Sequence, residues 1–198
     1  MTGSVRRPSR RQALATPAVV APALFLLPPA VLSTVDREAL RAWGWTPLDH
    51  HGVPWPSSLA LLPGGRLQTA AFAGTGVSLL GLSAALPRSG RSAALGLCGG
   101  GLVAAAFPLD APTGDPGSLA SWVHSWPAVV HAGGFAVAGL AGLTAVAASR
   151  RRRDVVLATG LAVAAAVGRG PGWYAFLGGF FGWVAALAAR TRAEPPAG

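Results

Sequence analysis

The sequence contains no lysine, only one cysteine and few charged residues of either sign. Charged residues make up 12% of the 198 residues, well below the share usual in soluble domains. The single cysteine, Cys98, excludes an intramolecular disulfide framework and a metal site built from several cysteines. Hydrophobic residues reach 52% and the mean hydropathy is +0.47. The composition is therefore that of a chain whose solvent is a lipid bilayer.

Six apolar stretches separated by short polar links predict six transmembrane helices. A helix needs about 20 apolar residues, at about 1.5 Å each, to cross the hydrocarbon core. The predicted spans are 13–35, 67–86, 92–109, 126–148, 155–168 and 172–189. The sequence thus predicts an all-α fold, with a membrane domain at 13–189 between a basic tail at 1–12 and a C-terminal tail at 190–198. The prolines of the first span predict a bend in its helix.

The basic residues, all of them arginines, are distributed unevenly between alternate links. Most lie on one side: Arg6, Arg7, Arg10, Arg11, Arg88, Arg91, Arg150, Arg151, Arg152, Arg153, Arg190 and Arg192. The other side carries Arg37, Arg41, Arg66 and Arg169. By the positive-inside rule we expect both termini in the cytoplasm and a multi-pass protein of the cytoplasmic membrane. The net charge of +9 then reflects topology, and no nucleic-acid partner is expected.

Two further patterns concern the surfaces of the predicted bundle. Aromatic residues with a polar atom gather at its outward side, as in an interfacial belt: Trp43, Trp45, Trp55, Trp122, Trp126, Trp173 and Tyr174. Small residues recur at helix-packing spacing: Gly96 with Gly100, Gly178 with Gly182, and Gly133, Gly134, Ala138 and Gly142. They predict closely packed helices, and some of these faces could also form a homo-oligomer.

Ionisable residues on the outward side are the candidate functional groups. They are Asp110, Asp115, His124, His131 and Arg169. Such groups are costly at membrane depth and usually face a cavity or a partner. We therefore predict an outward-facing polar pocket between the third, fourth and fifth spans. The first outward link adds Asp49, His50 and His51.

Three interpretations of this cluster stay open. Asp110, His124 and His131 are a mixed carboxylate and imidazole set that suits zinc or a similar divalent metal, and Asp115 or the Asp49-His50-His51 run could complete it. Asp, His and Arg169 lining a cavity would instead bind a solute or relay protons. In the third interpretation the groups are structural: Asp110 pairs with Arg169 or caps a helix, and His131 forms a hydrogen bond with a backbone carbonyl.

The order of several motifs resembles a known family of prokaryotic membrane proteins. The motifs are Pro56-Ser57-Ser58-Leu59-Ala60-Leu61; Arg66 to Phe72 followed by Thr75-Gly76; Phe107-Pro108-Leu109-Asp110; Ser121-Trp122-Val123-His124 with His131; and Arg169 before a last span with Trp183. Together they resemble the domain of unknown function 998 family. The resemblance covers about Pro56 to Arg190 and implies a six-span membrane protein, with no activity attached.

We expect a membrane protein that binds a lipid or a small solute in the outward pocket, as a transporter-like or sensory component. Catalysis is not the favoured reading. The main alternative is a membrane-embedded metal-dependent hydrolase, in which a metal-bound water is activated by His131, Asp110 and a neighbouring carboxylate. A structural or assembly subunit is the third possibility. Expected partners are the lipid bilayer and the bound lipid or solute.

Overall fold

The computed structural model describes residues 8–42, 55–114, 118–149, 151–167 and 171–194, and this part of the chain is helical without any strand. The long helices are α1 (Arg10–Val19), α2 (Ala21–Val35), α4 (Arg66–Ala85), α5 (Gly90–Ala104), α6 (Trp126–Ala147), α7 (Arg152–Val167) and α8 (Pro171–Ala193). Short helices lie in the links: α3 (Arg37–Ala42), η1 (Ser58–Leu61) and η2 (Leu119–Trp122). The predicted all-α class is confirmed.

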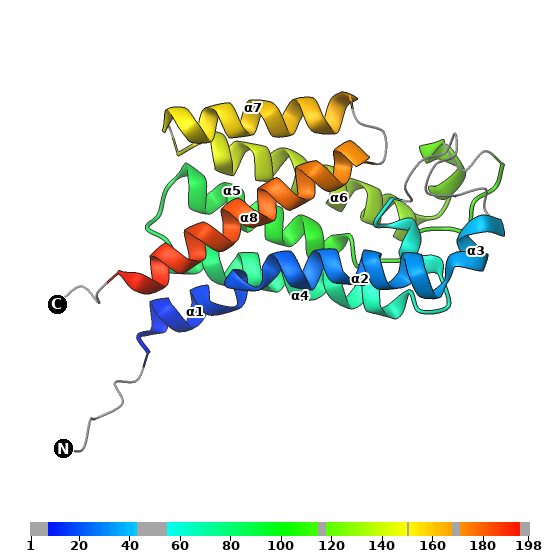
Figure 1. The fold of residues 1–198 in the computed structure, drawn as a ribbon, viewed down its shortest axis with the longest axis horizontal. Coiled ribbons are helices and arrows are strands. Elements are labelled where there is room, and N and C mark those ends of the chain that lie inside the picture. Colours follow the sequence, from blue (N-terminus) through cyan, green and yellow to red (C-terminus); the bar gives the residue numbers. More distant parts are fainter. Residues whose placement is uncertain (1–7, 43–54, 115–117, 150, 168–170, 195–198) are drawn as a thin grey trace, which may run out of the picture.

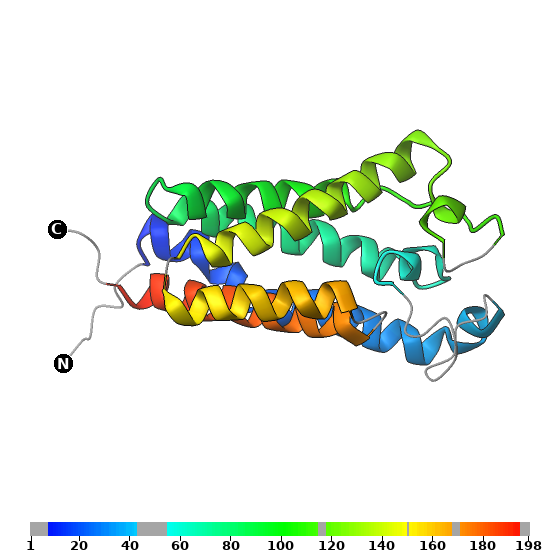
Figure 2. The ribbon, with the colours of Figure 1, turned by 90° about the horizontal axis from the view of Figure 1, so that it is seen from above.

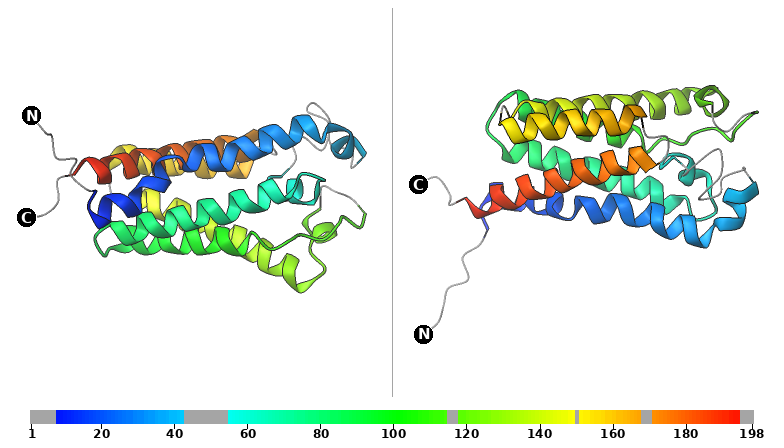
Figure 3. Two further views of the ribbon diagram at one scale, coloured as in Figure 1. Left: turned by 90° about the horizontal axis from the view of Figure 1, so that it is seen from below. Right: turned by 45° about the horizontal axis from the view of Figure 1, so that its top comes forward.

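The long helices form one antiparallel bundle (Figure 1). α1 and α2 run in one direction, and α4, α5, α6, α7 and α8 then alternate along the bundle. α1 begins and α8 ends at the same end, which we call the terminal end (Figure 1). The described parts of the two long links, residues 36–42 with 55–65 and 105–114 with 118–125, lie at the opposite, distal end (Figure 3). α4, α5 and α6 form one side, and α7 and α8 lie along the other beside α2 (Figure 2).

Four helical segments are long and apolar enough to cross a membrane. They are Arg10–Val35, Arg66–Ala85, Trp126–Ala147 and Gly172–Ala193. α5 and α7, at the third and fifth predicted spans, have 15 and 16 residues. At about 1.5 Å per residue they are about 22 to 24 Å long, shorter than a typical hydrocarbon core.

The first predicted span is broken into two helices at Val20, so its predicted bend is confirmed. Pro22 lies in the first turn of α2, where its missing N–H costs nothing. Continued as one helix, the chain would need that N–H and would place the proline ring against the preceding turn. Both halves are nevertheless central to the bundle, since Ala15, Ala18 and Phe25 are fully buried.

The third predicted span ends early, at Ala104 instead of Leu109. The amides of Ala106 and Phe107 donate to Val103 and Ala104, in a tighter last turn. Pro108 follows, and a proline disfavours helical backbone at the residue before it. The carbonyl of Phe107 is thereby left outside the helical ladder. α8 differs in the other direction, because it continues to Ala193, into the predicted tail.

Glycines bring three helices into backbone contact. A Cβ on Gly76 of α4 would lie 2.6 Å from the carbonyl oxygen of Gly99 of α5. A Cβ on Gly134 of α6 would lie 2.6 Å from the carbonyl oxygen of Gly101. Of the glycines singled out in the sequence, Gly134 lies in such a backbone contact, whereas a Cβ on Gly142 would lie 3.1 Å from the ring of Phe180. Gly100, Gly133, Gly178 and Gly182 face open space in the described structure.

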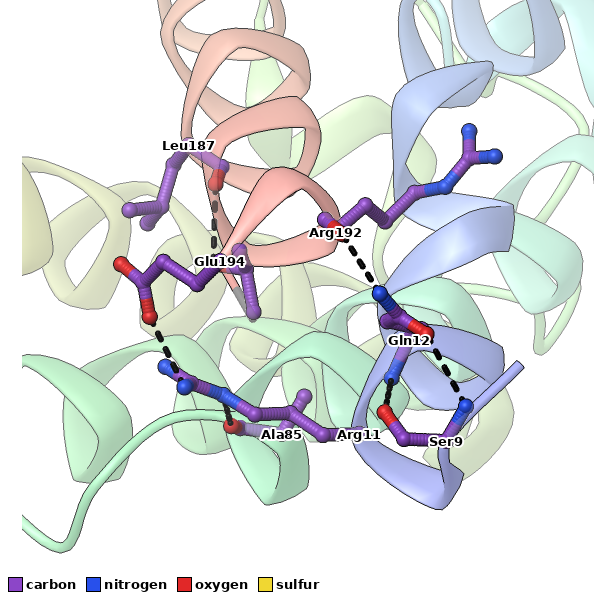
Figure 4. Close-up of polar contacts among 8 residues, drawn as sticks. Ser9, Arg11, Gln12, Ala85, Leu187, Arg192 and Glu194 are labelled. Carbon is purple, nitrogen blue, oxygen red and sulfur yellow. Dashed lines mark hydrogen bonds and ion pairs between the residues drawn. The ribbon is translucent and has the colours of Figure 1, made fainter. Parts of the chain in front are cut away.

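The start of α1 ties together the ends of α4 and α8 (Figure 4). Ser9 and Gln12 form a capping box that satisfies the first amides of α1. Arg11 donates from Nε to the carbonyl of Ala85, 2.9 Å away, and its guanidinium lies 2.8 Å from the carboxylate of Glu194. Gln12 donates from Nε2 to the carbonyl of Arg192 at 2.9 Å. These bonds close the terminal end of the bundle.

Candidate functional site

The second distal link, between α5 and α6, folds back on itself and is held by its own backbone. The amide of Asp110 donates to the carbonyl of Trp122 at 3.2 Å, and the amide of Thr113 donates to Ser121 at 3.0 Å. Trp122 is fully buried in a small distal core. The members of this core are Leu32, Leu40, Leu59, Leu62, Leu109, Trp122 and Ala128. Asp110 and His124 therefore face each other across a fixed loop.

Asp110 collects three hydrogen bonds in front of α6. Its Oδ2 accepts from the backbone amides of His124 and Ser125, both at 2.7 Å, and its Oδ1 accepts from the hydroxyl of Ser125 at 2.6 Å. The Nδ1 of His124 also lies 3.1 Å from Oδ2. Both carboxylate oxygens are thus engaged by the residues that lead into α6. We call Asp110, His124 and Ser125 the link clamp.

These contacts lower the pKa of Asp110 below its ordinary value of 3.8. The largest cause is the hydrogen bond from the Ser125 hydroxyl. The two backbone amides and the nearby His124 add to it, and partial desolvation opposes it. Donors that point at a carboxylate stabilise its charged form. Asp110 is therefore ionised, and its negative charge is stabilised by hydrogen-bond donors of the same link.

His131 lies five positions into α6 and is 2% exposed. Its Nδ1 is 2.7 Å from the carbonyl oxygen of Phe107, the carbonyl that the early end of α5 leaves free. Phe72 of α4 packs edge-on against the imidazole, with ring centroids 5.6 Å apart, and Phe135 stacks at 6.5 Å. The other nitrogen, Nε2, is buried and has no hydrogen-bond partner among the described residues. The predicted hydrogen bond between His131 and a backbone carbonyl is therefore confirmed, and Nδ1 makes it. It does not account for the buried Nε2.

His131 lines a cavity of about 330 Å³ at the distal end. α6 diverges from α8 towards this end (Figure 2), and both helices contribute to the wall. The lining residues are Trp55, Pro56, Ser57, Leu109, Leu119, His131, Ala132, Phe135, Ala136 and Trp173. Only Ser57 and His131 among them have polar side chains apart from the two indoles. The wall is apolar and aromatic, the character usual in small-molecule sites.

Phe135 and Trp173 close the inner side of this cavity. Their ring centroids lie 5.8 Å apart, and both residues also line a smaller void of about 20 Å³ deeper in the bundle. Cys98 and Leu102 of α5 lie at that inner void. The aromatic pair therefore separates the distal cavity from the packed core.

The structure brings only part of the predicted pocket together. Asp110 and His124 meet in the link clamp, whereas His131 faces the cavity, whose described lining includes neither of them. Asp115 and Arg169, and likewise Asp49, His50 and His51, lie outside the described residues. Within the described ranges, no three His, Cys, Asp or Glu side chains are grouped to hold a metal ion. In the described structure, Asp110, His124 and His131 are thus not gathered into one group of possible metal ligands.

Two polar residues near His131 were not expected from the sequence. Gln68 and Thr75 flank Phe72 on the inner face of α4 and are fully buried. Neither amide atom of Gln68, nor the hydroxyl of Thr75, has a hydrogen-bond partner in the described part of the chain. A lone carboxamide inside an apolar stretch was the available signal for Gln68. Trp55 and Trp173 were assigned to an interfacial belt, but they line the cavity.

Comparison with known proteins adds no relative to this picture. The chain matches no protein-family model, no curated protein and no solved structure. The resemblance to the domain of unknown function 998 family therefore has no support beyond the motifs of the sequence.

Proposed function

We propose that this chain is a six-span protein of the cytoplasmic membrane that binds the apolar part of a lipid or small solute in its distal cavity. The observation that carries the proposal is the cavity itself. It has about 330 Å³ of space and a nearly continuous apolar and aromatic wall. One of its lining residues, His131, has a buried Nε2 atom without a hydrogen-bond partner among the described residues. A packed membrane bundle has no structural need for such a space.

The six-span topology is supported by the antiparallel order of the helices and by the arginines. α5 and α7 lie between longer helices and connect opposite ends of the bundle (Figure 1). A short hydrophobic helix is accommodated by local thinning of the bilayer or by its neighbours. Arg11, Arg88, Arg91 and Arg192 lie at the terminal end, which by the positive-inside rule faces the cytoplasm. The distal cavity then opens on the outer side.

Cysteine labelling in intact cells tests this topology. In a Cys98→Ala background, Thr113→Cys places a thiol in the distal link and Gly90→Cys places one at the terminal end, where the side chain meets open space. We expect a membrane-impermeant maleimide to label Thr113→Cys in intact cells and Gly90→Cys only after lysis. Labelling of both, or of Gly90→Cys alone, would contradict the proposed orientation.

Binding is tested by quenching of tryptophan fluorescence with two brominated probes, bromo-octane and ω-bromo-octanol, in detergent micelles. Trp55 and Trp173 line the cavity, so a bound bromine quenches them in a saturable way. Ala132→Phe fills the cavity and should abolish the saturable component. The matched control is Ala147→Phe, at an exposed position near the other end of the same helix, which should keep it. No saturable quenching by either probe, or equal quenching in both variants, would refute the binding function.

A further inference from the structure

The hydrogen bond of His131 to Phe107 fixes which nitrogen of the ring carries a proton. A carbonyl oxygen only accepts hydrogen bonds, so the nitrogen 2.7 Å from it must donate. Nδ1 therefore carries the proton. In a neutral imidazole the other nitrogen, Nε2, then has a free lone pair and is an acceptor.

The surroundings of His131 favour the neutral ring. Its contacts in the described structure include the rings of Phe72 and Phe135 and the backbone carbonyls of Phe107 and Ala105. An imidazolium is costly when it is buried without a counter-ion. Asp110, the acidic residue that the sequence grouped with His131, already has its two oxygens occupied by Ser125 and the amide of His124. Nε2 of His131 is thus a buried acceptor without a hydrogen-bond partner among the described residues, and the Ser57 hydroxyl is the other side-chain acceptor in the described lining of the cavity.

We propose that the distal cavity recognises a neutral amphiphile that carries a hydroxyl group at its polar end, and that this hydroxyl donates a hydrogen bond to Nε2 of His131. The inference rests on the binding function proposed above and specifies its ligand. A buried acceptor without a partner is unfavourable, so a ligand that donates to it gains more than the same bond would bring in water. The apolar wall accommodates the hydrocarbon part.

The same geometry disfavours other head groups. An ether or a ketone offers only lone pairs and would bring an acceptor against an acceptor. A carboxylate also lacks a donor, and it would have to leave water for a wall on which no described lining residue is charged. An alkane fills the space but leaves Nε2 without a partner. Binding should therefore rank octanol above octane, octyl methyl ether and octanoate.

His131→Asn is the decisive variant. The side-chain amide of asparagine can keep the bond that Nδ1 makes to Phe107, but it has no atom at the place of Nε2. His131→Gln is the complementary variant, because its longer amide brings an acceptor towards that place. His124→Asn is the matched control, because asparagine keeps the backbone amide that donates to Asp110 and the His124 side chain is absent from the described lining of the cavity.

The experiment measures the affinity of each octyl compound by competition against whichever brominated probe shows saturable quenching. In His131→Asn we expect the affinity for octanol to fall about 3- to 10-fold, the effect of one hydrogen bond, while octane and octyl methyl ether are unchanged. His131→Gln and His124→Asn should keep most of the preference for octanol. If His131→Asn does not fold, the wild-type ranking of octanol against octyl methyl ether decides the question.

The outcomes separate the two proposals. Saturable quenching that Ala132→Phe abolishes, without any preference for octanol over its ether, would overturn the hydroxyl inference and leave the binding function standing. An equal loss for every compound in His131→Asn would also overturn it, because that result assigns His131 a purely structural role. Absence of saturable quenching by both brominated probes would instead remove the binding function, and the inference with it.

Discussion

The Oδ1 atom of Asp110 accepts a 2.6 Å hydrogen bond from the hydroxyl of Ser125, the residue that precedes the first turn of α6. This contact joins the link that follows α5 to the start of α6. His131 lies six residues after Ser125, on the first turns of that helix, so the link clamp also sets the position of the imidazole at the cavity. A charged residue of the loop thereby supports an apolar site that it does not itself line.

The link clamp predicts a pH dependence of the distal end. Because the pKa of Asp110 is lowered by folding, its stabilising effect is complete above the unfolded value of about 4 and is lost as the pH falls through the lowered folded value. Amide exchange at His124 and Ser125, corrected for the intrinsic rate, should be constant from neutral pH down to about pH 5. It should accelerate in the acidic range below about pH 4.

Asp110→Asn provides the control for this prediction. The asparagine amide has one acceptor oxygen where the carboxylate has two, so at least one of the two backbone amides or the Ser125 hydroxyl loses its bond. Exchange at His124 and Ser125 should be faster at neutral pH and should not change further in acid. A wild-type transition centred well above pH 5 would show that another group governs the loop.

Gly134 and its neighbour Gly133 should respond in opposite ways to the same substitution. Gly134→Ala places a methyl group 2.6 Å from the carbonyl oxygen of Gly101 and 2.7 Å from Cβ of Ala104. Since backbone atoms cannot turn aside, α5 and α6 must separate, and we expect the free energy of unfolding to fall by about 1 to 3 kcal/mol. Gly133→Ala meets open space and should be neutral or stabilising by up to about 1 kcal/mol. Reversible unfolding in mixed micelles measures both, and equal effects would contradict the described helix contact.

The buried amide of Gln68 leads to a third prediction. Its two polar atoms have no partner in the described structure, and each unsatisfied buried group costs about 1 to 3 kcal/mol. Gln68→Met keeps the shape of the side chain and removes the polar atoms. Unfolding measurements should therefore show a gain in stability, on the order of 1 kcal/mol or more. Thr75→Val tests the same idea at the other side of Phe72. A loss of stability in Gln68→Met would mean that the amide is satisfied by a bound molecule or by residues outside the described ranges.

The fold was largely predictable because hydropathy and helix length depend on local sequence. The helix ends that differed were decided by local backbone chemistry: Pro22 divides the first span at Val20, and Pro108 ends α5 early. The helix-breaking effect of these prolines can also be predicted from the sequence, although a hydropathy pattern alone does not include it. The apolar composition of α5 and α7 predicts that both helices cross the membrane. Because they have only 15 and 16 residues, their crossing stays a prediction.

The candidate site was less predictable, because tertiary packing decides it. Asp110 and His124 were expected to share a pocket with His131, and their chemistry made that reasonable. The loop instead uses Asp110 to satisfy its own amides, and the divergence of α6 from α8 creates an apolar cavity beside His131. Residue spacing predicts neither the direction in which an imidazole points nor the angle between two helices. Trp173 was therefore placed at an interface and not at the cavity.

The final prediction concerns Arg11, which connects α1 to two other helices at the terminal end. Glu194→Gln removes only the ion pair with Arg11, a contact in which the acidic side chain is 56% exposed. It should change the free energy of unfolding by less than about 1 kcal/mol and lose even that effect in high salt. Arg11→Ala also removes the donor to the carbonyl of Ala85 at the end of α4, so it should cost about 1 to 2 kcal/mol, much of it independent of salt.

Arg10 supplies the matched control for Arg11. It is the preceding residue of the same turn, and its side chain is exposed. Arg10→Ala should leave stability unchanged, within about 0.5 kcal/mol. Equal losses in Arg10→Ala and Arg11→Ala would indicate that positive charge near the bilayer surface, and not the bond to Ala85, stabilises this end. A loss confined to Arg11→Ala, and retained in high salt, would show that α1 stabilises the bundle by binding the end of α4.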